Sequence, residues 1–318
     1  MNNDLNFKKI NKNTLSIITY HFIRKKNDRN YKGIKYLKLD DFKKQIKYFR
    51  KKYTIIDQNT LIKVINSKKN ISNKPLLVLT FDDGYVDHYK YVFPILKKNK
   101  ISGIFYLPAS ILKKKFILNV NKIQFIITKF NKTKLLLNEI DNYLKKHSSF
   151  TLRKILSSGK IKFNRQYGNN ETTLIKGILQ YHLPNPLRQK LVDFLFKKFF
   201  KKKDYIKNLY LNKKQIIEMK KSKMNFGIHG VNHDWFEYMS TNEQKLEIKN
   251  LIKFFKKIFP NEKKISICYP YGSYDSKTSQ IARKAKIDFG LTINKGVINL
   301  NKKFNKLFLP RIDTNYFL

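Results

Sequence analysis

Short apolar runs alternate with amphipathic stretches along the first third of the chain. The apolar runs are residues 15–22, 53–56, 76–81 and 101–107. Runs of this length, rich in β-branched and aromatic residues, predict buried strands of a parallel sheet. Between two of these runs, residues 58–68 repeat apolar side chains at helical spacing, which predicts a helix packed on the sheet. Strand and helix therefore alternate as in an α/β fold.

The stretch 111–210 has a different texture, because helical patterns dominate it and no cluster of chemically active residues stands out. The predicted helices are residues 123–130, 135–144 and 187–200. We expect one catalytic domain over residues 1–318, with 111–210 as a helical insertion. An independent substrate-binding subdomain within 111–210 stays open as an alternative.

Alternation of strands and helices returns at residue 213. The predicted elements are a helix at 214–221, a strand ending near 229, a helix at 241–259, a strand at 265–268, a helix at 276–286 and a strand at 289–292. Ser240 or Thr241 is expected to cap the helix at 241–259, and Asp40 to cap a helix near the start of the chain. Residues 307–313 are expected to form a tail.

The composition is that of a folded and strongly basic protein. Of 318 residues, 42% are hydrophobic, and 25 Phe with 19 Tyr can fill a sizeable core, which excludes a disordered chain. The net charge of +46 would attract polyanions. The lysines, however, are spread along the whole chain in pairs and triplets, which indicates compositional bias. No specific nucleic-acid partner is therefore expected, while peripheral contact with an anionic membrane stays open.

The sequence shows neither a targeting segment nor a cysteine framework. The first apolar run is too short for a signal peptide or a membrane span, which predicts a cytoplasmic protein. Cys268 is the only cysteine, so disulfides within the chain and cysteine-based zinc clusters are excluded.

Two adjacent carboxylates, Asp82 and Asp83, follow the apolar run at 76–81 and precede Gly84. An Asp-Gly pair marks a turn, so both acids are expected where a strand ends, which is where active sites concentrate in α/β folds. Side chains of consecutive strand residues diverge, so one carboxylate can bind a metal while the other acts as a base. By itself, the tripeptide also fits an ordinary solvated turn.

A second cluster, His229 and His233, lies at the end of another predicted strand, with Gly230 between the two histidines. Neutral imidazoles are common ligands of divalent metals, and one carboxylate beside two histidines is a usual catalytic zinc set with an open position. Two ordinary polar loop histidines are the alternative. Together with Asp82 and Asp83, the pattern favours a site for a divalent metal, with Zn²⁺ as the first choice.

Three segments, residues 80–85, 229–233 and 269–272, resemble in that order the first three motifs of the polysaccharide deacetylase family, the NodB-like carbohydrate esterases. The resemblance extends from the strand with Tyr20 and His21 to residues 309–312, with the helical insertion in between. It implies a distorted (β/α) barrel of about seven strands. It also implies metal-dependent removal of an acetyl or other small acyl group from an amino sugar.

The resemblance assigns roles residue by residue. It implies that Asp82 is the general base and that Asp83, His229 and His233 are the metal ligands. A backbone N–H near Tyr271 is expected to help hold the oxyanion of the tetrahedral intermediate.

Some positions depart from the family pattern. The arginine that supports the base in many members is absent from the third motif, where Cys268 or Tyr269 stands, so that role is vacant or filled by Arg311. Arg311 also stands where a histidine acting as general acid would fall, which leaves the proton donor open. His21 is a candidate for lining the site, and Asp288 for a remnant of the fourth motif.

The predicted function is metal-dependent hydrolysis of an N-acyl group on an amino sugar of a surface glycan or lipopolysaccharide precursor. One alternative is a formamide or cyclic-amide hydrolase on the same fold, and another is a polyanion-binding protein without enzymatic activity. The sequence leaves open the sugar, the acyl group and the oligomeric state.

Overall fold

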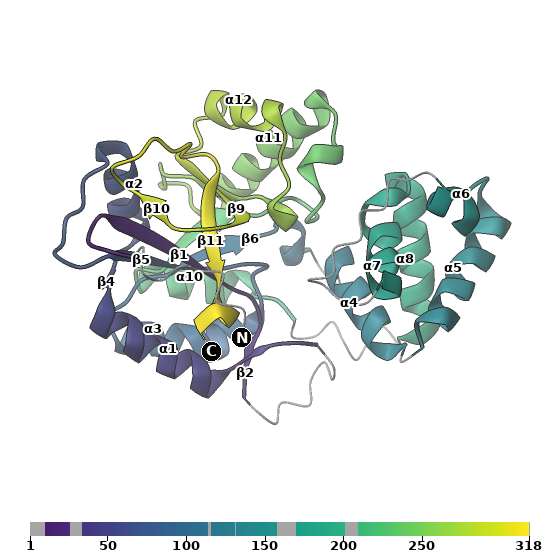
Figure 1. The fold of residues 1–318 in the computed structure, drawn as a ribbon, viewed down its shortest axis with the longest axis horizontal. Coiled ribbons are helices and arrows are strands. Elements are labelled where there is room, and N and C mark those ends of the chain that lie inside the picture. Colours follow the sequence, from purple (N-terminus) through teal and green to yellow (C-terminus); the bar gives the residue numbers. More distant parts are fainter. Residues whose placement is uncertain are drawn as a thin grey trace. The chain divides into compact units, whose positions relative to one another are not determined.

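The chain divides into two units in a computed structural model, and we call them the barrel unit and the helical unit (Figure 1). The described residues are 10–25, 34–113, 116–130, 132–157, 170–200 and 209–317. The barrel unit comprises Met1–Asp28, Lys35–Lys114 and Asn208–Leu318, and the helical unit comprises Arg29–Ile34 and Lys115–Lys207.

Seven parallel strands among the described residues close into a barrel. They are β1 (Thr14–Tyr20), β5 (Leu76–Phe81), β6 (Ile104–Leu107), β7 (Asn225–Ile228), β8 (Ser266–Cys268), β9 (Phe289–Lys295) and β11 (Leu309–Asp313). Their order is β1-β11-β9-β8-β7-β6-β5, and β5 pairs back with β1 to close the ring. The predicted distorted (β/α) barrel of about seven strands is confirmed. The expected tail, however, is wrong, because β11 is a barrel strand.

Shorter strands extend the sheet beside the barrel. Strand β4 (Thr54–Ile55) runs parallel to β5, and β10 (Ile298–Asn299) runs antiparallel to β1. Strands β2 (Ile23–Arg24) and β3 (Leu37–Lys38) form a separate parallel pair.

Six α-helices of the described barrel unit surround the strands (Figure 1). They are α1 (Leu39–Lys52), α2 (Gln58–Ser67), α3 (Phe93–Lys98), α10 (Lys213–Lys221), α11 (Thr241–Ile258) and α12 (Ser276–Lys284). Ser240 caps α11 as predicted, accepting a hydrogen bond from the backbone of Glu243. The predicted cap of α1 is wrong, because this helix starts directly after β3, with Lys38 at the cap position. Asp40 lies in its first turn, where a carboxylate suits the helix dipole.

Short helical turns follow or join the main elements. A π-helical turn, η2 (His88–Val92), leads into α3, and Pro94 stands in the first turn of that helix. The 3₁₀ turns of the barrel unit are η3 (Ala109–Leu112), η6 (Phe236–Tyr238), η7 (Pro270–Gly272) and η8 (Thr314–Phe317).

A row of aromatic side chains runs across four neighbouring strands and fixes their register. Tyr20 pairs with Phe81, Phe81 with Phe105, and Phe105 with Phe226, and successive ring centroids are 4.7–5.7 Å apart. The ring of Tyr20 also packs edge-on against α1, so this row faces the helices. Because consecutive strand residues point to opposite faces, the following residue Asp82 points away from the helices.

Alternate residues on the other strand face form the barrel core together with α2. The cluster takes residues at every second position of several strands, such as Leu15 and Ile17 of β1 and Leu76 and Val78 of β5. These side chains are buried, as expected for strands covered on both faces. Because apolar side chains fill the interior of the barrel, polar side chains can gather only where the strands end.

The helical unit has a hydrophobic core of its own. Its described helices are α4 (Asn119–Lys129), α5 (Thr133–His147), α6 (Leu152–Ser157), α7 (Asn170–Gly177), the π-helical turn η5 (Ile178–His182) and α8 (Asn185–Phe199). Ile140 and Leu144 of α5 and Leu191 and Leu195 of α8 are fully buried. The role of residues 111–210 as an insertion into one catalytic domain stays a prediction. Within the described parts of both units, we find no helix with the length and apolarity that a membrane span requires.

Candidate functional site

Left-handed backbone conformations gather at the carboxyl ends of three barrel strands. Asp83 follows β5 with φ of 69°, His233 follows β7 with φ of 63°, and Tyr271 follows β8 with φ of 56°. Such conformations cost a residue other than glycine about 1–3 kcal/mol and persist where the surrounding structure enforces them. Three of the six predicted site residues therefore share an unusual backbone geometry at one end of the barrel.

Asp83, His229 and His233 converge on one point. Oδ1 of Asp83 lies 3.4 Å from Nε2 of His229 and 3.4 Å from Nε2 of His233. All three side chains are buried, and Oδ1 of Asp83 has no hydrogen-bond partner among the described residues. In a tetrahedral zinc site with bonds of about 2.0–2.1 Å, neighbouring ligand atoms are about 3.3–3.4 Å apart. The observed spacing fits a divalent cation held by these three atoms.

The hydrogen bonds and charges of these groups show what metal binding would require. Nδ1 of His229 is 2.6 Å from the carbonyl oxygen of Cys268, so this nitrogen donates and Nε2 faces Asp83. Burial tends to lower the pKa of His229, but Cys268 and Asp83 outweigh it and raise the pKa well above its usual value, so a metal at Nε2 would displace a proton. Burial lowers the pKa of His233 to about 4, so this imidazole is neutral at neutral pH. Burial tends to raise the pKa of Asp83, but the two imidazoles outweigh it and keep the carboxylate charged.

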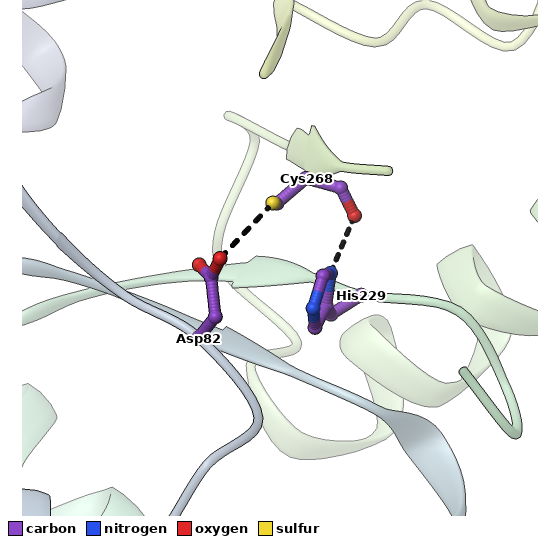
Figure 2. Close-up of side chains that lie close together, drawn as sticks. All are labelled: Asp82, His229 and Cys268. Atoms are coloured by element: carbon purple, nitrogen blue, oxygen red, sulfur yellow. Dashed lines mark hydrogen bonds between the residues drawn. The ribbon is translucent and has the colours of Figure 1, made fainter. Parts of the chain in front are cut away.

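Cys268 lies between the two predicted clusters (Figure 2). Its sulfur is 3.6 Å from Oδ2 of Asp82, while its carbonyl oxygen accepts the hydrogen bond from His229. One ligand atom each from Asp82, His229 and Cys268 lie within 4.8 Å of one another, which makes a second set of possible metal ligands. That set fits less well, because Nδ1 of His229 is already a donor and Asp82 is engaged in an ion pair.

Asp82 is a buried carboxylate paired with Arg311. Nη1 of Arg311 lies 3.0 Å from Oδ1 and 2.8 Å from Oδ2 of Asp82, and both side chains are almost fully buried. Burial would raise the pKa of Asp82, but the charge of Arg311 prevails and lowers the pKa below its usual value. Thr19 donates a hydrogen bond of 3.3 Å to Oδ2, and Nε2 of the half-exposed His21 is 3.8 Å from the same oxygen. Asp82 is therefore ionised and oriented beside the three converging groups.

Arg311 is itself fixed from two sides. Its Nε donates to the carbonyl oxygen of Thr292 at 2.8 Å, and its Nη1 donates to the hydroxyl of Thr80 at 3.3 Å. The sequence left the position beside Asp82 either vacant or filled by Arg311, and the structure places Arg311 there. Its guanidinium group keeps its proton and does not suit the part of a general acid. Burial tends to lower the pKa of Arg311, but the charge of Asp82 outweighs it and raises the pKa further.

The third motif forms a tight turn over the histidines. The ring of Tyr271 packs edge-on against His233, with centroids 4.5 Å apart, and stacks on Trp235 at 4.4 Å. Gly272 also has a positive φ, of 67°, and a side chain there would collide with the backbone of Ile293. The predicted Tyr271 is thus brought next to a predicted metal ligand.

The loop between the two histidines is supported by its neighbours. Backbone N–H groups of η3 donate to the carbonyl oxygens of Gly230 and Val231. Oε1 of Glu247, on α11, accepts a hydrogen bond of 2.5 Å from the N–H of Val231. Burial raises the pKa of Glu247 to about 7.

Comparison with known families identifies the chain. The family model described as polysaccharide deacetylase matches residues 69–147 and 188–290, more than half of the sequence. The chain belongs to the polysaccharide deacetylase family. Membership implies a hydrolytic deacetylase that acts on glycans. A search among curated proteins found no match.

Solved structures of low sequence identity share the deacetylase fold. The Streptococcus pyogenes deacetylase PplD, solved with acetate, is 20% identical, with a TM-score of 0.59 over 94% of this chain and 92% of that chain. IcaB from Ammonifex degensii is 14% identical, with a TM-score of 0.57 over 96% and 93%. The BpsB deacetylase domain from Bordetella bronchiseptica is 14% identical, with a TM-score of 0.53 over 96% and 97%.

The structure separates one residue considered in the sequence from the candidate site and adds others. Asp288 accepts a hydrogen bond from the N–H of Ile265, just before β8 and at the opposite end of that strand from Asp82 and the histidines, so its side chain does not contribute to these converging groups. Thr19 and the carbonyl group of Cys268 were not predicted as site groups. No local signal marks them, because only strand pairing brings them next to Asp82 and His229.

Proposed function

We propose that this polysaccharide deacetylase is a metal-dependent hydrolase that removes an acetyl or other small acyl group from the nitrogen of an amino sugar. A surface glycan or lipopolysaccharide precursor is the proposed substrate class. The observation that carries the proposal is the equal spacing of 3.4 Å from one unpartnered Asp83 oxygen to two imidazole nitrogens. A second, charged carboxylate beside them remains available for proton transfer.

Asp83, His229 and His233 would hold the metal. One carboxylate oxygen and two imidazole nitrogens form a donor set that suits Zn²⁺ and leaves a position for substrate and water. A bound divalent cation supplies Lewis-acid chemistry, polarising the amide carbonyl group and lowering the pKa of water toward about 7.

Asp82 would act as the general base. Its carboxylate takes the proton of the attacking water, and Arg311 and Thr19 hold it in the ionised form with one orientation. A backbone N–H at Tyr271, in the left-handed turn over His233, would donate to the oxyanion as the tetrahedral intermediate forms.

His21 is the proposed general acid. Its Nε2 is 3.8 Å from Asp82, and 48% of its side chain is exposed, so it borders the buried base and still reaches a substrate. Arg311, at the position where the family histidine would fall, pairs with Asp82 and keeps its proton. His21 would deliver a proton to the leaving amine as the carbon–nitrogen bond breaks.

Metal content and product release test the proposal together. Purified wild-type protein should contain about one equivalent of divalent metal by elemental analysis, and His233→Ala should lose it. Asp82→Asn should keep the metal but lose turnover, and His21→Gln should keep the metal with strongly reduced turnover. His147→Gln, a substitution of an exposed histidine in the helical unit, is the matched control. Wild-type protein that binds no metal, or a metal-loaded Asp82→Asn variant with full turnover, would contradict the proposal.

A panel of substrates separates the remaining readings. Acetate release from N-acetylated amino-sugar donors and oligomers supports the proposed substrate class, whereas formate release or opening of a cyclic amide supports another amide hydrolase on the same fold. Metal-free protein that binds polyanions with a steep salt dependence would support the polyanion-binding alternative. A cytoplasmic location and contact with anionic membranes stay predictions.

A further inference from the structure

The second oxygen of the Asp83 carboxylate has a partner that is neither a histidine nor a metal. The hydroxyl group of Tyr85 donates to Oδ2 of Asp83 at 2.7 Å, and only 1% of Tyr85 is exposed. Oδ1 of the same carboxylate faces the two imidazoles. The two oxygens of Asp83 therefore have separate surroundings, one directed at the histidines and one occupied by a phenol.

The phenol of Tyr85 is held by parts of the chain that lie far apart in sequence. Its ring stacks on Phe22, which follows β1, with centroids 3.7 Å apart, and on Tyr210, which precedes α10, at 6.1 Å. Its backbone is bridged to Tyr210, and the N–H of Leu211 donates to the carbonyl oxygen of Gly84 at 2.8 Å. Ring and backbone are thus fixed together, so the hydroxyl has little freedom to leave Asp83.

A carboxylate placed in this way can offer only one oxygen to a metal. Without the phenol, Oδ2 of Asp83 would be buried without a donor, and the carboxylate could rotate about its Cβ–Cγ bond. Groups that orient the ligands of a metal in this manner typically change metal affinity by about 10–100-fold when they are removed.

We propose that Tyr85 is a positioning residue, which holds Asp83 as a one-oxygen ligand and thereby sets the metal affinity of the site. The inference rests on the proposed function, because it takes Asp83, His229 and His233 as the metal-binding set. Tyr85 itself contacts neither the metal nor the substrate in this account, and it acts entirely through Asp83.

The test measures Zn²⁺ affinity directly, with metal-free protein titrated against a chromophoric chelator. Tyr85→Phe removes only the hydroxyl and should weaken binding by about 10–100-fold. Tyr20→Phe is the matched control, because it removes an equally buried hydroxyl that donates to Gln45 at 2.9 Å, and it should bind as the wild type does. In an Asp83→Ala background, Tyr85→Phe should cause no further loss.

Each outcome decides the inference. Unchanged affinity of Tyr85→Phe, or an equal loss in the Asp83→Ala background, would overturn it, even if the wild type binds metal and releases acetate as proposed. Wild-type protein without metal affinity would instead overturn the proposed function and the inference with it. Should Tyr85→Phe fail to fold, Tyr85→Met, which also removes the hydroxyl donor to Asp83, takes its place, and full metal affinity in that variant would refute the positioning role.

Discussion

Replacing Arg311 by methionine should destabilise the barrel unit and abolish turnover, because Asp82 would lose its only ion-pair partner with a permanent charge among the described residues. The two groups are 2.8 Å apart and almost fully buried. At an effective dielectric constant of about 20, a pair of charges at that distance attracts by about 6 kcal/mol, and desolvation of both ions offsets several kcal/mol of it. Removal of one partner from a buried pair typically costs about 3–5 kcal/mol.

A double-mutant cycle isolates the ion pair from the other contacts of these side chains. Arg311→Met leaves a buried carboxylate with the hydroxyl of Thr19 and the thiol of Cys268 as weak donors. Asp82→Asn leaves a buried guanidinium with the carbonyl oxygen of Thr292. The double variant leaves no charge unpaired. Its loss of unfolding free energy should therefore be about 2–3 kcal/mol smaller than the sum of the losses of the two single variants. Its turnover should remain absent, because the base is missing.

The only tryptophan of the chain makes the measurement specific to the barrel unit. Trp235 stacks on Tyr271 beside the proposed metal ligands, so its fluorescence in urea follows the barrel unit and not the helical unit. Metal-free protein is required throughout, since a bound ion would add its own stabilisation to some variants and not to others. If the sum of the losses of the two single variants equals the loss of the double variant within about 0.5 kcal/mol, Asp82 and Arg311 are not energetically coupled, which would refute the prediction.

Three further substitutions have defined outcomes. Burial raises the pKa of Glu247 from 4.5 to about 7, so its contribution to stability is complete below pH 4.5 and is lost as pH rises through 7. The free energy of unfolding in urea should therefore fall by about 3 kcal/mol more in the wild type than in Glu247→Gln over this pH range. Burial lowers the pKa of His88 from 6.5 to about 4, so its contribution is complete above pH 6.5 and is lost in acid, and the difference between wild type and His88→Phe should show the opposite slope. Gly84→Ala adds a methyl group to a residue with φ of 63°, only 2.5 Å from the side chain of Ile111. It should lower the midpoint of thermal unfolding by several degrees, and an unchanged midpoint would show that this position tolerates a side chain.

The convergence of Asp83, His229 and His233 could be predicted from the sequence, because each part of this group follows directly after a recognisable strand. An apolar run followed by Asp-Asp-Gly, and a short strand followed by two histidines, both place polar groups at carboxyl ends of parallel strands. In a barrel these ends lie on the same side. The meeting of Asp83 with His229 and His233 therefore follows from the topology, although the chain separates them by about 150 residues.

The strand that carries Arg311 could not be predicted in the same way. Pro310 and Arg311 interrupt the apolar pattern of β11, and a proline lacks the N–H that a central strand needs. The pairing of β11 with β9 shifts its register between Leu309 and Arg311, an irregularity that accommodates the proline. Arg311 is tolerated inside the barrel only because Asp82, 229 residues earlier, neutralises it. The residues around Arg311 give no sign of this long-range pairing, so the strand could not be predicted from them.

The structure also explains how two neighbouring carboxylates acquire different chemistry. The aromatic row through Phe81 faces the helices, so Asp82 must face the other way, toward the Arg311 guanidinium. Asp83 continues with a positive φ instead of an extended one, which turns its side chain toward the histidines. A cation beside Arg311 would meet a permanent like charge, whereas Oδ1 of Asp83 faces two imidazoles, which can bind a cation once they have lost their protons. The strand register and the turn at Gly84 therefore direct Asp82 toward Arg311 and Asp83 toward the histidines, and the proposed order of base first and metal ligand second depends on this backbone.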